Sequence, residues 1–167
     1  MGLEGLIVVG GNGSLSVACK LHTEHQLPVV GVPKTIDNDI EGTDVTFGFD
    51  TAVQICVDAI DRLHTTAESH DRVMVVEVMG RHAGWITAAV GMAEDRDTPI
   101  PLLLLFPEVP FDEAKFLAAV DAKVKASGYC CVGVSEGLRN AAGQLMGEAG
   151  GKDAFGHAQL GGIGPQI

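Results

Sequence analysis

The sequence is poor in aromatic residues, in basic residues and in cysteine. Aromatic side chains make up 5% of the 167 residues, and 11 Lys and Arg stand against 22 Asp and Glu. The formal net charge of -11 argues against nucleic acid as a partner, because phosphate backbones are bound by basic surfaces. We therefore expect any phosphate ligand to be bound by a few local cations and by backbone N–H groups.

The few cysteines do not have the spacing of a zinc site. Each of the four lies in an apolar stretch, where small hydrophobic residues are usual: Cys19, Cys56, Cys130 and Cys131. We expect four reduced core residues in a protein of the reducing cytoplasm. Long apolar runs are absent too, because the longest, residues 6–9 and 102–106, have only the length of strands. We expect a soluble intracellular protein without a membrane partner.

Short apolar runs alternate with stretches of helical periodicity, a pattern typical of βαβ units. We expect strands over residues 6–9, 29–32, 73–78, 102–106 and 129–134. We expect helices from about residue 14 and over residues 50–69, 85–92 and 112–126. Asp112 is the expected N-cap of the last helix, and Gly128 its end. Because the apolar runs lack polar alternation, the sequence predicts an α/β fold, a parallel-sheet three-layer αβα sandwich covered on both faces.

Polar loops follow these strands, and the loops after the carboxyl ends of parallel strands carry the site in such folds. The glycine-rich residues 10–14 either let backbone N–H groups approach a phosphate or serve packing alone. Lys34, Thr35, Asp37 and Asp39 offer a cation, a hydroxyl and two carboxylates within one loop. The alternative for both aspartates is an Asx turn, which the spacing alone favours.

Two further loops carry charged side chains. Arg81, which leads into a helix, could bind a phosphate through two hydrogen bonds or could be a surface arginine. Glu136, which follows the last strand, could accept hydrogen bonds from sugar hydroxyls or could cap a turn.

Together the polar loops form five motifs in a fixed order: Gly10–Ser14, Pro33–Asp39, Val76–Arg81, Pro107–Phe111 and Ser135–Gly137. This order resembles that of the 6-phosphofructokinases, which use ATP or pyrophosphate. The resemblance runs through nearly all of this chain but matches only the middle portion of a family subunit. Family subunits begin with an earlier glycine-rich strand and end with an Arg/His cluster, and we expect neither here.

The resemblance implies a glycolytic phosphotransferase that moves a phosphoryl group from ATP, or less readily pyrophosphate, to the C1 hydroxyl of fructose 6-phosphate. It makes Asp37 the base, and Thr35 and Arg81 the other catalytic residues. It implies the substrate-binding set Thr35, Asp37, Arg72, Met79, Gly80, Arg81 and Glu136. It implies the nucleotide- or phosphate-binding set Gly11, Asn12, Gly13, Ser14 and Lys34. Because Arg72 matches an arginine that reaches a neighbouring subunit's substrate, self-association is expected.

Two positions bear on the donor and one on the metal. The resemblance links Gly13 with ATP, because a side chain there would occupy the space of the α-phosphate, and links Lys34 with pyrophosphate. We give Gly13 more weight, because a steric block is harder to evade than an added cation. The implied cofactor is Mg²⁺, but Asn12 stands where the family has a charged Asp ligand, so we expect weaker metal retention. Asp39 is the second candidate metal ligand.

The implied organisation is a partial phosphofructokinase domain over residues 1–167, with nucleotide-side elements in about 1–36, substrate-side elements in about 37–137 and an irregular tail over 138–167. We expect little turnover from this chain alone. The alternative function is a non-catalytic regulatory subunit that binds sugar phosphate or nucleotide; Asn12 favours it, whereas Asp37 favours catalysis. A generic nucleotide-binding α/β protein would leave the ordered motifs unexplained.

Overall fold

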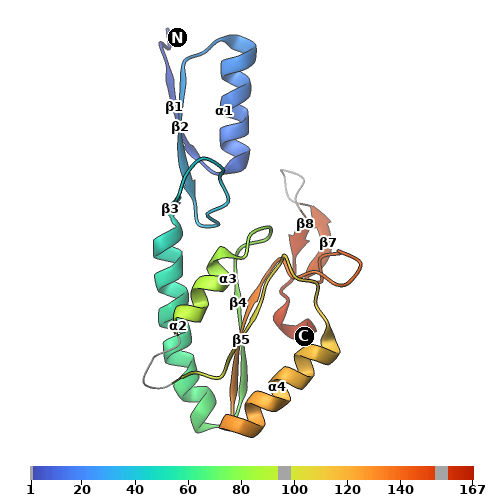
Figure 1. Cartoon of the computed structure of the whole chain (residues 1–167). Helices are drawn as coiled ribbons and strands as arrows, with labels where there is room; N and C mark the ends of the chain where they lie inside the picture. Colours follow the sequence, from blue (N-terminus) through green and yellow to red (C-terminus); the bar gives the residue numbers. More distant parts are fainter. Residues whose placement is uncertain (1, 94–98, 153–157) are drawn as a thin grey trace. The chain divides into compact units, whose positions relative to one another are not determined.

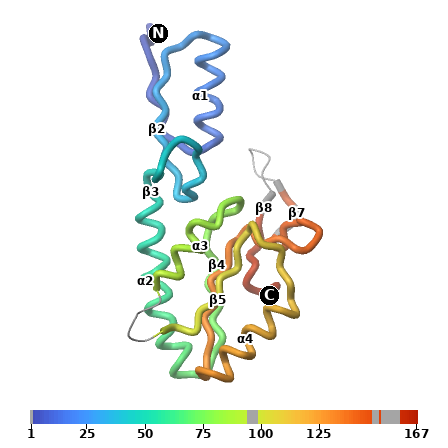
Figure 2. The backbone as a smooth tube through the Cα atoms, in the orientation of Figure 1, coloured from blue at the N-terminus to red at the C-terminus, as the bar shows by residue number. Residues whose placement is uncertain are grey.

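The computed structural model describes residues 2–93, 99–152 and 158–167 (Figures 1 and 2). The chain divides into two compact units, Met1–Thr51 (unit 1) and Ala52–Ile167 (unit 2). Each unit contains a three-stranded sheet in which all the pairings are parallel. Helices follow the strands in both units, so the predicted α/β class is confirmed. The expected division of roles near residue 36 is a functional one and stays a prediction.

Unit 1 is a βαβ element with one short added strand. Its elements are β1 (Leu6–Gly10), α1 (Asn12–His25), β2 (Val29–Thr35) and β3 (Phe47–Gly48), and the strand order is β1-β2-β3. Helix α1 lies against one face of the sheet so closely that a Cβ on Gly31 would be 3.0 Å from a methyl carbon of Leu15. Gly10 pairs with Pro33, which places the ends of β1 and β2 side by side.

The second face of the unit 1 sheet is exposed in this chain. Ile7, Val9 and Val30 have exposed fractions of 70%, 59% and 61%. In the described part of this chain, helix α1 packs on the two long strands from one side, whereas the sequence predicts cover on both faces. The same geometry explains Cys19, which we expected in the core. Ala18 faces the sheet and is buried, whereas Cys19 is exposed.

Unit 2 has three layers built around a buried central strand. Its elements are α2 (Phe49–Ser69, whose first residues belong to unit 1), β4 (Val73–Val78), α3 (Trp85–Val90), η1 (Gly91–Ala93), β5 (Leu102–Leu105), α4 (Glu113–Ser127), β6 (Cys130–Ser135), β7 (Glu148–Lys152), β8 (Ala158–Leu160) and η2 (Gly164–Gln166). The strand order is β4-β6-β5, and every residue of β6 is buried.

Helices of unit 2 pack on both faces of its sheet. On one face, Phe116 of α4 contacts Cys130 and Val132. On the other face, a Cβ on Gly133 would lie 3.0 Å from a methyl carbon of Val90 in α3. The predicted cover on both faces is therefore confirmed for β6, the central strand of unit 2.

The predicted start and end of α4 are confirmed in detail. The Asp112 carboxylate accepts a hydrogen bond from the Lys115 backbone N–H over 3.1 Å, as an N-cap does. Gly128 ends the helix with a φ of 86°, in the left-handed region that favours glycine. Strand β4 has the predicted bounds, Val73–Val78.

The segment expected to be an irregular tail contains two short strands. Strands β7 and β8 pair in antiparallel fashion; residues 153–157 between them lie outside the described residues. Ile163 is fully buried and packs with Val134 and Leu138. Its backbone N–H donates a hydrogen bond to Glu77 in β4 over 2.7 Å. The described end of the chain is therefore fixed to the unit 2 sheet.

Candidate functional site

The glycine-rich turn lies in unit 1, between the end of β1 and the start of α1. Gly11 is the N-cap of α1, so the unpaired backbone N–H groups of the first helical turn begin here, as a phosphate site requires. Gly10 has a packing role, because a Cβ there would lie 2.6 Å from the Ser14 Cβ. At this turn, packing explains one glycine and the helix start offers donors to an anion.

Gly13 has no packing reason to be glycine. A Cβ added there would meet no atom within 4 Å, and the residue lacks the positive φ that would favour glycine. Glycine inside a helix lowers stability by about 0.5–1 kcal/mol relative to alanine. The ligand role that the resemblance implies for this position stays a prediction.

The loop after β2 is shaped by hydroxyl and amide groups. The Thr35 hydroxyl accepts a hydrogen bond from the Asp37 backbone N–H over 3.2 Å. The Thr46 hydroxyl donates to the Thr35 carbonyl over 2.7 Å, and the Thr46 backbone N–H donates to the Asn38 side-chain oxygen over 2.9 Å. Asn38 also has a φ of 53°. Thr35, Asn38 and Thr46 thus hold the segment that carries Asp37.

Asn12 and Asp39 join the glycine-rich turn to this loop. The Asn12 side-chain N–H donates to an Asp39 carboxylate oxygen over 2.9 Å and to the Asp39 carbonyl over 3.4 Å, across 27 residues of sequence. Lys34 is exposed at the end of β2, where it pairs in register with Phe47. Unit 1 therefore brings together the predicted phosphate-binding residues and the loop of the predicted base.

The Asn12–Asp39 pair fits a magnesium ion only in part. Asp39 supplies a charged oxygen, which Mg²⁺ prefers, but Asn12 turns an N–H donor toward it. Among residues 2–93, 99–152 and 158–167, no three His, Cys, Asp or Glu side chains are grouped as metal ligands. An ion here would need further oxygens from water or from a bound phosphate.

The second group of predicted residues lies in unit 2, at the carboxyl ends of two paired strands. Val78 at the end of β4 pairs with Ser135 at the end of β6. The buried Ser135 hydroxyl donates to the Gly80 carbonyl over 2.7 Å and accepts from the Gly137 N–H over 3.0 Å. The Glu136 backbone N–H donates to the Val78 carbonyl over 2.9 Å.

Gly137 shows why the Ser-Glu-Gly motif ends in glycine. A Cβ on Gly137 would overlap the carbonyl group of Arg81, so the two loops pass in direct backbone contact. Gly80 has a φ of 123°, which also favours glycine. Arg81 and Glu136 are both half-buried, and Met79 is exposed. Unit 2 thereby places Met79, Gly80, Arg81 and Glu136 in one loop cluster.

Arg72 does not join this cluster. It precedes β4, at the amino end of the strand, whereas Met79 follows the carboxyl end. The Arg72 residue is exposed, and its backbone N–H donates to the Ala67 carbonyl over 2.9 Å. The structure therefore forms two groups, one in each unit, with Arg72 apart from the second. The loops of the two groups follow strands of two separate sheets, and a shared role for them stays a prediction.

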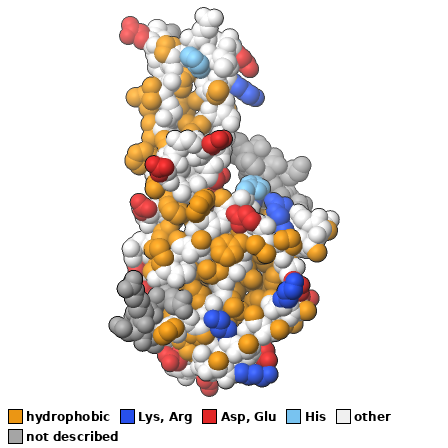
Figure 3. Space-filling view, viewed as in Figure 1, with side chains coloured by type: hydrophobic (Ala, Val, Ile, Leu, Met, Phe, Trp, Pro, Cys, Tyr) orange, Lys and Arg blue, Asp and Glu red, His pale blue; other side chains and the backbone are white. Residues whose placement is uncertain are grey.

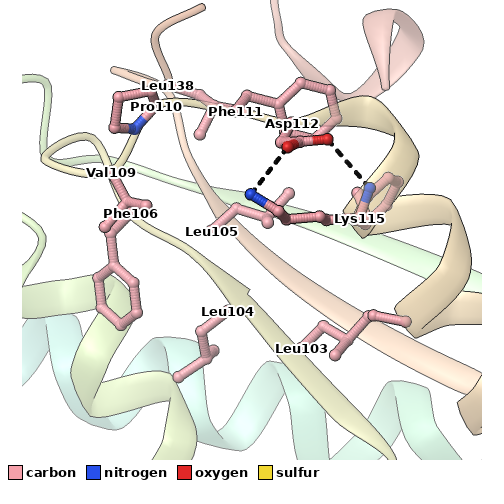
Figure 4. A pocket seen from close by; sticks show the side chains of 12 residues that line it. Leu103, Leu104, Leu105, Phe106, Val109, Pro110, Phe111, Asp112, Lys115 and Leu138 are labelled. Carbon is pink, nitrogen blue, oxygen red and sulfur yellow. Dashed lines mark hydrogen bonds and ion pairs between the residues drawn. The ribbon is translucent and has the colours of Figure 1, made fainter. Parts of the chain in front are cut away.

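A different hollow of unit 2 is apolar and carries none of the predicted site residues. This groove of about 330 Å³ lies between β5 and α4 and is lined mainly by hydrophobic side chains, among them Leu103, Phe106, Val109, Phe111 and Phe116 (Figure 4). Figure 3 shows hydrophobic side chains gathered over this part of unit 2. The Asp112–Lys115 ion pair, 3.0 Å long, supplies its charged groups. The groove lacks the converging donors of a phosphate site.

Sequence reasoning missed the contact made by Glu108. The Pro107–Phe111 motif received no role, yet the Glu108 carboxylate accepts a hydrogen bond from the Gly84 N–H over 2.7 Å. The signal in the sequence was the motif itself, because a carboxylate between two prolines after an apolar strand has no evident local partner.

No helix in the described part of the chain combines the length and apolar character needed to cross a bilayer.

Comparison with known proteins agrees with the motifs. The family model described as "Phosphofructokinase" matches residues 1–165. The ATP-dependent 6-phosphofructokinase of Mycobacterium tuberculosis is 49% identical over 168 residues, which cover 99% of this chain and 47% of the relative. The pyrophosphate–fructose 6-phosphate 1-phosphotransferase of Streptomyces coelicolor is also 49% identical, over 98% of this chain and 46% of its own length.

Solved structures show the same similarity. The pyrophosphate-dependent phosphofructokinase of Nitrosospira multiformis superposes with a TM-score of 0.78 at 40% identity, covering 84% of this chain and 38% of that protein. The chain thus spans about half the length of the relatives that it matches. On sequence, motif order and fold together, this chain belongs to the phosphofructokinase family.

Proposed function

We propose that the chain carries the catalytic aspartate and part of the substrate site of a cytoplasmic enzyme that phosphorylates the C1 hydroxyl of fructose 6-phosphate. The observation that carries the proposal is the Asn12–Asp39 hydrogen bond, which joins a helix start suited to phosphate with the loop of Asp37. Asp37 accepts the hydroxyl proton as the C1 oxygen attacks the transferred phosphorus, while the bond from that phosphorus to the bridging oxygen of the donor breaks and releases ADP, or phosphate where pyrophosphate is the donor. Thr35 shapes the Asp37 segment through its hydroxyl.

In the same proposal, the unit 2 cluster binds the sugar phosphate and neutralises charge. The Arg81 guanidinium offers paired N–H donors to phosphate oxygens, and it lies on a loop held by Ser135. The Glu136 carboxylate accepts hydrogen bonds from sugar hydroxyls. Arg72, exposed at the amino end of β4, reaches the substrate of a second copy. Weak turnover by the 167-residue chain alone is part of the proposal.

ATP is the proposed donor, with pyrophosphate as the alternative. A Cβ built on Gly13 would meet no atom within 4 Å, so the backbone there is open to the approach of an α-phosphate. The exposed Lys34 would favour pyrophosphate as the donor, but we give Gly13 more weight. The relatives include enzymes named for each donor at the same identity, so similarity does not separate the two.

Mg²⁺ is the proposed cofactor, and it would lower the charge repulsion between the transferred phosphate and its acceptor. Asp39 would hold it, and phosphate oxygens and water would supply further ligands. The Asn12 amide keeps Asp39 oriented toward the glycine-rich turn without adding a second negative charge. Metal retention therefore depends on the bound phosphate.

A second candidate function is a regulatory subunit that binds sugar phosphate or nucleotide without catalysis. The residue type of Asn12 favours it, because an amide stands where the family has a charged metal ligand. The presence of Asp37 favours the catalytic proposal, since binding alone requires no base there.

Calorimetric titration of the 167-residue chain with fructose 6-phosphate tests the proposed function. Arg81→Ala should abolish binding, whereas Arg62→Ala, at an exposed position on α2, should leave it unchanged. Asp37→Asn should retain sugar-phosphate binding, and any basal formation of fructose 1,6-bisphosphate should disappear. If the unaltered chain gives no heat of binding with fructose 6-phosphate, the proposal is contradicted.

A further inference from the structure

Glu108 makes a long-range contact to the loop that carries Arg81. One carboxylate oxygen accepts the Gly84 backbone N–H over 2.7 Å, across 24 residues of sequence. Glu108 follows β5, and Gly84 stands between the Arg81 loop and helix α3. The contact therefore ties the connection after one edge strand to the connection after the other.

Gly84 is shaped to admit this carboxylate. A Cβ on Gly84 would lie 2.7 Å from the second Glu108 oxygen, 2.9 Å from a ring carbon of Phe106 and 3.1 Å from a ring carbon of Pro107. Gly84 is buried, and its φ of -84° is open to any residue, so close approach rather than backbone conformation requires the glycine. The segment after β5 is thus packed directly onto the start of α3.

Helix α3 supplies no cap of its own. Its N-cap residue, Gly84, has no side chain, and its first turn contains no acidic residue. Unpaired N–H groups at a helix start favour a negative charge, and a hydrogen bond to a carboxylate is stronger than one to a neutral acceptor. Glu108 provides from a distant segment what the helix sequence lacks.

Arg81 lies between two such attachments. On its N-terminal side, the Ser135 hydroxyl holds the Gly80 carbonyl over 2.7 Å, and on its C-terminal side Glu108 holds the Gly84 N–H over 2.7 Å. Fixing both ends of a five-residue segment limits the backbone conformations of the residues between them. The position of the Arg81 guanidinium then depends on both attachments.

We propose that Glu108 is a positioning residue for the Arg81 loop, acting through the Gly84 N–H. The assignment of Arg81 to a sugar-phosphate ligand rests on the proposed function, whereas the attachment itself rests on the contacts within unit 2. Sequence motif, glycine geometry and helix capping each point to the same carboxylate.

Amide hydrogen exchange of the ¹⁵N-labelled 167-residue chain tests the attachment. In Glu108→Ala, the Gly84 amide should exchange about 10- to 100-fold faster, as expected for loss of a hydrogen bond to a charged group. Glu108→Gln keeps a neutral acceptor and should restore part of the protection. Glu113→Gln removes an exposed carboxylate from the first turn of α4 and should leave the Gly84 rate unchanged.

A second readout separates positioning from general stability. Fructose 6-phosphate, titrated into each variant, should bind Glu108→Ala about tenfold more weakly than Glu113→Gln, with Glu108→Gln between them. Glu108→Asp keeps the charge but is one methylene shorter, and its affinity for fructose 6-phosphate should resemble that of Glu108→Ala. If Glu108→Ala does not fold, Glu108→Asp takes its place in the comparison. An unchanged Gly84 exchange rate would overturn the attachment.

Faster Gly84 exchange with unchanged affinity for fructose 6-phosphate would overturn the positioning role. If the unaltered chain does not bind fructose 6-phosphate, the proposed function fails. In that case two measurements test the hydrogen bond from the Gly84 N–H to Glu108: the Gly84 exchange rate and the accessibility of the neighbouring Trp85 indole to quenchers. Equal quenching of Trp85 in Glu108→Ala and Glu113→Gln would count against this hydrogen bond.

Discussion

The side-chain N–H of Asn12 donates a hydrogen bond to the Asp39 carboxylate over 2.9 Å, although 27 residues separate them in the sequence. Asn12 opens helix α1, and Asp39 lies in the loop after β2. A carboxylate at position 12 could not donate this hydrogen bond, and two carboxylates at this distance repel each other unless a proton or a cation lies between them. The amide therefore makes this contact independent of a metal.

Asn12→Asp should consequently make the stability of the chain dependent on Mg²⁺. In EDTA, we expect its free energy of unfolding to fall by about 1–2 kcal/mol, because a hydrogen bond is replaced by repulsion. Millimolar Mg²⁺ should recover most of this loss. Thermal unfolding with and without Mg²⁺ measures it, with Asn12→Ala as the control that loses the hydrogen bond but gains no response. Equal Mg²⁺ responses in the two variants would refute this account of Asn12.

Ser135 gives a second prediction, because its buried hydroxyl serves two backbone groups. Ser135→Ala should lower the free energy of unfolding of unit 2 by about 1–3 kcal/mol, since the Gly80 carbonyl and the Gly137 N–H both lose a partner. Urea unfolding followed by the fluorescence of Trp85, the one tryptophan of the sequence, measures this. Ser127→Ala at the exposed end of α4 is the control and should change stability by less than about 0.5 kcal/mol. Similar losses in both variants would contradict the assigned role of Ser135.

Gly13 gives a prediction in which stability and binding change in opposite directions. Gly13→Ala should raise the free energy of unfolding by at most about 0.5–1 kcal/mol, the value for the middle of a helix, because the added methyl meets no atom within 4 Å and alanine favours the helix. ATP affinity should fall, since the methyl enters the space proposed for a phosphate, whereas affinity for inorganic pyrophosphate should change less. Calorimetry with both ligands tests this; unchanged ATP affinity would remove Gly13 from the donor site.

The buried thiols give a prediction about pH. Burial raises the pKa of Cys131 from its usual 9.0 to about 11 and also raises the pKa of Cys130. Because the folded state holds these protons more tightly than the unfolded state, their contribution to stability is complete below about pH 9 and is lost as the pH rises toward 11. Urea unfolding at several pH values should show this decline, and a Cys130→Ala, Cys131→Ala double variant should flatten it. An equally steep decline in that variant would contradict the assignment.

The βα pattern could be predicted because continuous apolar runs and polar loops are local features. Strand β4 has its predicted bounds, and Asp112 and Gly128 cap α4 as their residue types indicate. The exposure of Ile7 and Val9 could not be read from the same kind of run. An apolar run shows that a strand suits burial on both faces, but it does not say which other segment provides the cover.

The contacts that shape the candidate site were less predictable, because they join residues far apart in the sequence. The Asn12–Asp39 and Gly84–Glu108 hydrogen bonds both follow from which strands are neighbours. The two strands of the tail also escaped prediction, because the glycine-rich residues 148–152 show no alternation of apolar side chains. The order of the motifs indicated the family. To predict which residues each motif contacts, the order of the strands in the sheets was needed as well.

The Arg81 loop of unit 2 is the proposed sugar-phosphate site, held between Ser135 and Glu108. Two-dimensional ¹H–¹⁵N spectra of the 167-residue chain, recorded during titration with fructose 6-phosphate, test this proposal most directly. We expect the Gly80–Gly84 amides to shift in the unaltered chain and to keep their positions in Arg81→Ala. Unchanged Gly80–Gly84 amides in the unaltered chain, or equal shifts in Arg81→Ala, would contradict the proposal.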